Sequence, residues 1–199
     1  MTRTGREEAP GETVTSAESS CRDERPVHGG GCHFVTICTR GLAPLLGKVV
    51  DGQVYLTPAG EIVTGRLQVR GHRLEGFEVR DFVVMPNHLH AVFVPREDSA
   101  LVALRKLGGI RVRRPVGLEV LAQEVGQLNA WCSRRIALDG IAGFGWAPRF
   151  DARPIGTARQ AELLRSFITS DSQRWLGDEA DPRTLVPAIV ATAPRRPSP

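Results

Sequence analysis

Near its middle the chain reads Phe82-Val83-Val84-Met85-Pro86-Asn87-His88-Leu89-His90-Ala91-Val92-Phe93-Val94. Two apolar, β-branched runs on either side of a Pro-Asn dipeptide are typical of two strands joined by a tight turn. Residues two apart in a strand share a face, so we expect His88 and His90 to point together while Leu89 faces a core. Two imidazoles on one face can bind a metal ion. The alternatives are surface histidines or histidines bonded to backbone carbonyls.

The flanking residues favour a buried position for this pair. Val83, Met85 and the run Ala91–Val94 have the apolar character of interior strands. Histidines on a buried strand need polar partners or a metal, because an unpaired polar group is costly in an apolar interior.

The residues before this stretch predict strands, a hairpin and a helix. Asp51-Gly52 is a strong type I′ turn signal. Thr57 followed by Pro58 is a favourable helix start, with Thr as N-cap, and we expect that helix to run to about Arg70. We expect strands or extended segments over residues 32–39, 45–50, 53–56, 76–85, 88–95 and 146–155.

Two further helices are expected after the central strands. Residues 118–138 carry apolar side chains at steps of three and four, and so do residues 158–174. Residues 1–31 and 177–199 lack this periodicity, and we expect a disordered N-terminal arm and a flexible Pro/Ala-rich tail. The pattern predicts one α+β domain over 32–176, with a mostly antiparallel sheet and helices packed on one face.

Composition narrows the functional class only a little. The chain has 199 residues, 41% hydrophobic, with a net charge of +4. We see no run long enough to cross a bilayer and no secretory signal, so we expect a soluble cytoplasmic protein without a membrane partner. The four cysteines lack paired spacing, which favours free thiols over a disulfide framework.

Basic residues are concentrated in the second half of the chain. Residues 101–160 contain ten basic and four acidic side chains, a net of +6. Such a surface suits a phosphate backbone. Because the basic residues are nearly all arginine, the nucleotide composition of the genome offers another explanation for part of the excess. The candidate DNA-binding residues are Arg105, Lys106, Arg111, Arg113, Arg114, Arg134, Arg135, Arg149 and Arg153.

The segment Met85-Pro86-Asn87-His88-Leu89-His90 resembles the metal-binding motif of the HUH single-tyrosine transposases, and in particular the REP-associated tyrosine transposases. Only this segment is specific; the similarity over the rest of residues 32–176 is supportive. The supporting segments are Phe34–Arg40, Val49–Val54, Gly60–Val63, Gly126–Ile136 and the region between Trp146 and Trp175.

The resemblance implies a ferredoxin-like HUH domain, a cofactor and a reaction. In that family a divalent metal, Mg²⁺ or Mn²⁺, sits on the two histidines and polarises a phosphodiester of single-stranded or hairpin DNA. A tyrosine then attacks to form a phosphotyrosine link, so the enzymes are endonucleases that act in DNA transposition. The resemblance also implies a bacterial, nucleoid-associated protein that is a monomer or homodimer.

The residue at the position of the nucleophile departs from this pattern. Carrying the family's last helix over places Phe167 where the catalytic tyrosine stands, and phenylalanine has no hydroxyl. The only tyrosine of the chain is Tyr55, on the expected hairpin, where an aromatic side chain commonly packs on the sheet. Because no other tyrosine is present in the sequence, Tyr55 remains an alternative nucleophile beside this packing role.

Asp171 lies one helical turn after Phe167, at the spacing where the family has a third metal ligand. Residues at i and i+4 share a helix face, and a carboxylate is a good ligand for a hard cation. The alternative is a solvated aspartate near a helix end.

Three functional hypotheses remain open from the sequence. One is a transposase-family protein that keeps metal and single-stranded DNA binding but has lost strand transfer. Another is an active nuclease that uses metal-activated water or Tyr55. The last is a regulatory module that binds DNA or RNA without catalysis.

Overall fold

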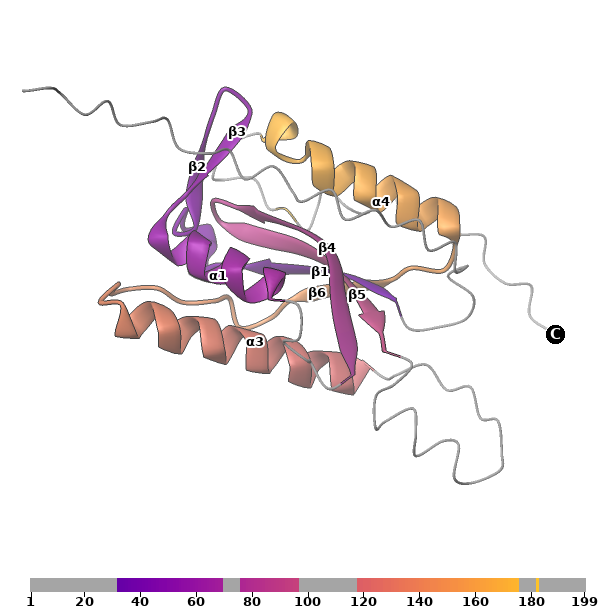
Figure 1. The fold of residues 1–199 in the computed structure, drawn as a ribbon, viewed down its shortest axis with the longest axis horizontal. Helices are drawn as coiled ribbons and strands as arrows, with labels where there is room; N and C mark the ends of the chain where they lie inside the picture. Colours follow the sequence, from indigo (N-terminus) through magenta and orange to yellow (C-terminus); the bar gives the residue numbers. More distant parts are fainter. Residues whose placement is uncertain (1–31, 70–75, 97–117, 176–181, 183–199) are drawn as a thin grey trace, which may run out of the picture.

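The central element of the fold is a four-stranded sheet. The computed structural model describes residues 32–69, 76–96, 118–175 and 182. The sheet contains β1 (His33–Cys38), β4 (Phe77–Met85), β5 (His88–Pro95) and β6 (Asp151–Pro154). Its order is β4-β5-β1-β6, and each pairing is antiparallel (Figure 1). The expected N-terminal arm and nearly all of the tail lie outside the described residues, so the domain bounds of 32 and 176 stay predictions.

A separate hairpin follows the first strand. A short 3₁₀ helix, η1 (Arg40–Leu42), leads to β2 (Gly47–Val50) and β3 (Gln53–Leu56). The backbone angle φ is +51° at Asp51 and +74° at Gly52. Positive φ at both central residues is what a type I′ turn requires, so the predicted hairpin is confirmed.

Helix α1 (Pro58–Gln68) begins where the sequence predicts. The Thr57 hydroxyl accepts a hydrogen bond from the Gly60 backbone N–H at 3.2 Å. Gly60 is also where the first turn meets the hairpin, since an added Cβ would overlap the carbonyl oxygen of Leu46. The helix ends two residues before the expected Arg70.

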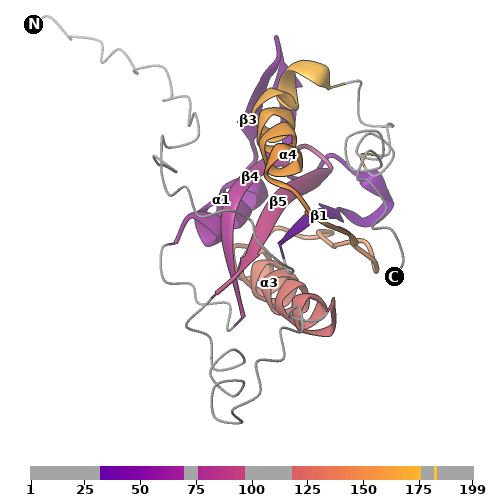
Figure 2. The same ribbon diagram turned by 90° about the vertical axis from the view of Figure 1, so that its right-hand side faces the viewer.

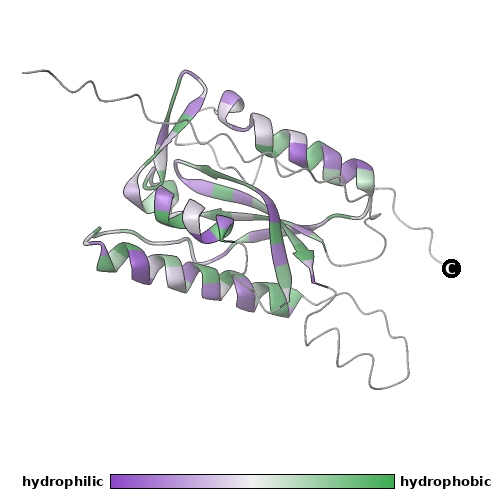
Figure 3. Ribbon diagram, viewed as in Figure 1, coloured by the Kyte–Doolittle hydropathy of each residue, from purple (hydrophilic) through white to green (hydrophobic). Residues whose placement is uncertain are grey.

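The two later helices are amphipathic (Figure 3). Helix α3 spans Leu118–Leu138, as expected. Helix α4 spans Ala158–Ser170 and begins at a capping box, in which Thr157 and Gln160 satisfy each other's backbone N–H groups. The chain then forms a second 3₁₀ helix, η2 (Ser172–Arg174). The predicted end of this helix at residue 174 is therefore wrong, because α4 ends at Ser170 and Asp171 is its C-cap residue.

The sheet separates two apolar clusters. Val35 and Ile37 of β1 pack with α1 and α3, whereas their neighbour Phe34 packs with α4. Alternate residues of a strand point to opposite faces, so α4 covers the face opposite α1 and α3 (Figures 1 and 2). The expected α+β class and antiparallel sheet are confirmed, but the helices do not all pack on one face.

The order of elements explains this arrangement. Strands β1, β4, β5 and β6 with helices α1 and α3 form a β-α-β-β-α-β unit, the ferredoxin-like topology. Both helices of that unit lie on one face, and α4 follows the unit and covers the other. Among the described helices, none combines the length and apolar character needed to cross a membrane.

Candidate metal centre

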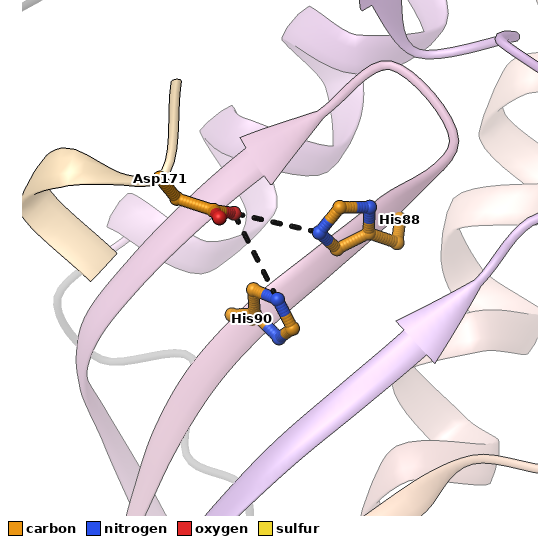
Figure 4. Close-up of side chains that lie close together, drawn as sticks. All are labelled: His88, His90 and Asp171. Carbon is orange, nitrogen blue, oxygen red and sulfur yellow. Dashed lines mark ion pairs between the residues drawn. The ribbon is translucent and has the colours of Figure 1, made fainter. Parts of the chain in front are cut away.

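Three polar side chains meet between β5 and the end of α4. His88 and His90 come from β5, and Asp171 is the residue at which α4 ends (Figure 4). Asp171 Oδ2 lies 3.5 Å from His88 Nε2 and 3.8 Å from His90 Nε2. The structure thus brings together the three residues that the sequence suggested as metal ligands.

The position of β5 inside the sheet explains why this group is buried. His88 pairs with Cys38 on one side and Met85 on the other, and His90 pairs with Thr36 and Val83. Exposure is 1% for His88, 0% for His90 and 4% for Asp171. These values contradict surface histidines and a solvated aspartate.

Each histidine uses its Nδ1 atom for a side-chain contact. His88 Nδ1 lies 2.7 Å from Asn87 Oδ1, and His90 Nδ1 lies 2.9 Å from Thr36 Oγ1. These Nδ1 partners are side chains, so the suggested bond to a backbone carbonyl is not what holds the rings. Both rings turn their Nε2 atoms toward Asp171.

The atoms that face one another are left without hydrogen bonds. His88 Nε2, His90 Nε2 and Asp171 Oδ2 are buried and find no hydrogen-bond partner among the described residues. Because the Asn87 side-chain amide oxygen Oδ1 accepts from His88 Nδ1–H, the uncharged form of the ring presents a lone pair at Nε2. A lone pair facing a carboxylate is unfavourable unless a metal ion or a proton lies between them, and with a protonated ring these contacts are ion pairs. All candidate ligand atoms lie within 4.8 Å of one another, so the group could hold a divalent metal.

Burial favours the neutral, metal-binding form of His90. Desolvation, and then the nearby His88, lower the pKa of His90 well below 6.5. At neutral pH this ring is therefore uncharged and can offer a lone pair to a metal.

Aromatic rings enclose the group. Phe167 meets the His90 ring edge-on at a centroid distance of 5.4 Å, and Phe34 lies 5.0 Å from the same ring. Trp175, just after η2, stacks on His88 at 5.9 Å with planes 20° apart. Phe167 is 4% exposed and belongs to the cluster under α4. The ring at the suggested nucleophile position is thus an apolar wall of the site.

Tyr55 stands in a different environment. Its side chain is 51% exposed on β3, and its hydroxyl lies 3.5 Å from Gln53 Oε1. The contact of this hydroxyl is within β3 and not with His88, His90 or Asp171.

The suggested DNA-binding residues are spread over both sides of the sheet. Arg153 pairs with Phe34 across β6 and β1, so it projects from the face that carries the histidines. Its Nε donates to Asp151 Oδ2 at 2.7 Å. Arg134 and Arg135 are exposed on α3, which covers the opposite face, and Arg149 is exposed before β6. Outside the described residues lie Arg105, Lys106, Arg111, Arg113 and Arg114.

Sequence reasoning missed three residues at this site, namely Thr36, Asn87 and Trp175. Thr36 is a fully buried hydroxyl within an apolar strand, and Asn87 is a fully buried amide within the turn. A polar residue within an apolar strand, or in the turn directly before the two histidines, is the sequence signal that indicates such a role. The stacking of Trp175 depends on how η2 folds back, which no local pattern reports.

Comparisons with known proteins find transposases among solved structures. A REP-associated tyrosine transposase bound to a REP hairpin is 18% identical, with 70% of this chain and 65% of that chain covered and a TM-score of 0.36. A putative transposase from Deinococcus radiodurans R1 is 13% identical, with 69% and 87% covered and a TM-score of 0.31. The chain thus spans less than two thirds of the first of these proteins.

The sequence matches no protein-family model. A search of curated proteins also finds no match. At these values the similarity to the two transposases defines no family, and the chemistry of the site follows from its own residues.

Proposed function

We propose that the chain is an HUH-type DNA-processing protein that binds single-stranded DNA at a divalent metal ion held by His88, His90 and Asp171. The observation that carries this proposal is the convergence of three buried acceptor atoms without hydrogen-bond partners among the described residues. A buried set of this kind is costly unless a cation completes it. The HUH-like segment from Met85 to His90 supplies the link to DNA processing.

The donor atoms fit a metal of intermediate hardness. Two imidazole nitrogens and one carboxylate oxygen suit Mn²⁺ better than Mg²⁺, which prefers an all-oxygen octahedron. We therefore propose that the site binds Mn²⁺ more tightly than Mg²⁺. Three protein ligands leave positions for a phosphate oxygen and for water, and a metal bound there supplies Lewis-acid polarisation of a phosphodiester.

The proposal excludes a phosphotyrosine intermediate at Phe167. A phenyl ring has no oxygen to attack phosphorus, and this ring packs on His90 and Phe34. Tyr55 is exposed on the hairpin, and its hydroxyl lies beside Gln53. We propose that metal-dependent binding of single-stranded DNA persists and that strand transfer does not.

One assay separates this function from its alternatives. The full-length protein is incubated with Mn²⁺ and an end-labelled hairpin oligonucleotide with single-stranded flanks, and products are run on native and denaturing gels. We expect retarded DNA on the native gel that needs Mn²⁺, and no covalent adduct on the denaturing gel. The double variant His88→Gln/His90→Gln should bind the DNA weakly, and Mn²⁺ should not increase the amount of retarded DNA.

The other outcomes identify other functions. A covalent adduct that disappears in Tyr55→Phe contradicts the proposal and assigns Tyr55 as nucleophile. Cleavage without an adduct, lost in the histidine double variant, indicates a nuclease that uses metal-activated water. Binding that is indifferent to Mn²⁺ and falls steeply with salt indicates a binding module that acts through its arginines.

A further inference from the structure

Two buried polar residues hold the far sides of the histidine rings. Asn87 Oδ1 lies 2.7 Å from His88 Nδ1, and Thr36 Oγ1 lies 2.9 Å from His90 Nδ1. Thr36 and Asn87 are both 0% exposed. Both contacts are made at Nδ1, whereas the Nε2 atom of each ring faces Asp171.

We propose that Thr36 and Asn87 are positioning residues that fix the ring tautomers, so that both Nε2 atoms present lone pairs to the metal. This inference rests on the proposed metal site. An amide oxygen only accepts hydrogen bonds, so His88 Nδ1 must carry a proton, and in the uncharged ring Nε2 is then bare. A threonine hydroxyl can accept in the same way, and it then keeps the His90 proton on Nδ1. Imidazole ligands in metal sites are commonly oriented by such a bond from the other ring nitrogen.

Backbone hydrogen bonds hold the turn that contains Asn87 in place. Thr39 donates to the Asn87 carbonyl oxygen from its backbone N–H and from its hydroxyl, each at 2.9 Å. The neighbouring Pro86 carbonyl oxygen accepts from the Leu46 N–H at 2.8 Å. The β4–β5 turn is thereby fastened to the residue after β1 and to the residue before β2, and the Asn87 side chain is held beside His88.

Thr36 is held equally firmly by the sheet. It lies in the middle of β1, paired with His90 on one side and Asp151 on the other. Directly paired residues of antiparallel strands have neighbouring side chains on one face. The hydroxyl is therefore presented to the His90 ring by the register of the sheet, without a flexible linker.

The test uses variants of the full-length chain that separate the hydroxyl from the shape of the side chain. Thr36→Val keeps the branched shape and removes the hydroxyl, whereas Thr36→Ser keeps the hydroxyl and removes a methyl group. Mn²⁺ affinity is measured by titration calorimetry. We expect Thr36→Val to bind about 10- to 100-fold more weakly and Thr36→Ser to bind within about threefold of the unaltered protein. Equal affinities for the two variants would overturn the role of Thr36.

A spectroscopic readout on metal-free protein tests the role of Asn87. The ¹⁵N signals of the histidine rings at pH 8 distinguish a proton on Nδ1 from one on Nε2. We expect His88 to be in the Nδ1–H form, and we expect Asn87→Ala to shift it toward the Nε2–H form while Asn87→Asp retains Nδ1–H. An Nε2–H form of His88 in the unaltered protein overturns the inference.

The two readouts keep this inference distinct from the proposed function. If the unaltered protein binds no Mn²⁺, the proposed metal site fails, and the ring spectra of the metal-free protein still decide whether Asn87 sets the tautomer. If the unaltered protein binds Mn²⁺ and Thr36→Val binds it equally well, the metal site stands and the positioning role of Thr36 is refuted.

Discussion

Phe167 places a phenyl ring, which has no nucleophilic oxygen, against His90. Its ring packs edge-on against both Phe34 and His90, with centroid distances of 6.2 and 5.4 Å. An aromatic ring of nearly the same shape with one additional oxygen would place a nucleophile beside the histidine pair. Under the proposed function, a single hydroxyl at this position separates DNA binding from strand transfer.

Phe167→Tyr therefore tests whether the rest of the site is intact. We expect a covalent protein–DNA adduct to appear with Mn²⁺ and a single-stranded substrate, detected as a shifted labelled band on a denaturing gel. The additional hydroxyl in an apolar cluster should lower the free energy of unfolding by about 1–3 kcal/mol unless it finds a partner. The control is the same variant with His88→Gln/His90→Gln, which should form no adduct. A folded Phe167→Tyr protein that binds DNA and forms no adduct contradicts the expectation.

His90 makes the stability of the metal-free protein depend on pH. Burial and His88 lower its pKa in the folded state well below 6.5, so the unfolded chain binds more protons below that pH. The stability contributed by the neutral ring is present above pH 6.5 and is lost as the pH falls, by at most about 1.4 kcal/mol per pH unit.

Urea unfolding in EDTA between pH 5 and 8 measures this effect. We expect the midpoint of the unaltered protein to fall below pH 6.5 more steeply than that of His90→Gln, in which the other titrating groups remain. Parallel midpoints for the two proteins across this range would show that His90 is not buried in its neutral form.

The end of α4 determines where Phe167 and Asp171 lie relative to the histidines. The capping box at Thr157 sets where the helix begins, and the last helical residue is Ser170. Asp171 follows one turn after Phe167, so one helix brings both the apolar wall and the carboxylate to the histidines. The chain then turns through η2 and stacks Trp175 on His88.

Trp175 should consequently report metal binding. Mn²⁺ is paramagnetic and quenches the fluorescence of a nearby indole, and Trp175 stacks directly on a proposed ligand ring. We expect Mn²⁺ to reduce the tryptophan emission of the unaltered protein and of Trp131→Phe, which alters a side chain on α3 across the sheet. Trp175→Phe should abolish the change, measured by emission titration. Equal quenching in Trp175→Phe would place the bound ion elsewhere.

Most individual elements follow from local sequence, and the site follows only in part. The Asp51-Gly52 turn, the Thr57 cap and the shared face of His88 and His90 depend on residues close in the chain, so their positions were predicted. The burial of Asp171 depends on α4 docking on the second face of the sheet. That docking brings residues 81 positions apart together, and no local periodicity encodes it.

For the whole molecule, the sheet divides the basic residues into two groups. Arg153 projects from the face of the histidines, whereas Arg134 and Arg135 lie on α3 beyond the opposite face. The charge count over residues 101–160 predicts a single basic patch. A count along the chain does not report on which face of the sheet each side chain lies. Under the proposed function, DNA bound at His88, His90 and Asp171 should pass Arg153 and not the arginines of α3.

This separation predicts unequal effects on DNA binding. Arg153→Gln should weaken binding of a single-stranded oligonucleotide and reduce the slope of log affinity against log salt by about 1, as expected for one lost phosphate contact. Arg134→Gln should leave both quantities nearly unchanged and serves as the matched control. The measurement is fluorescence anisotropy over a range of salt concentrations. A larger effect for Arg134→Gln than for Arg153→Gln would place the DNA on the α3 side.

The most direct test of the metal centre is calorimetric titration of the full-length protein with Mn²⁺ at pH 7.5. We expect one ion per chain, and we expect binding to vanish in His88→Gln/His90→Gln and to weaken strongly in Asp171→Leu. His33→Gln, which alters a buried histidine of β1 outside the cluster, should bind as the unaltered protein does. Absence of binding to the unaltered protein, or binding that survives loss of both His88 and His90, would contradict a metal site at these residues.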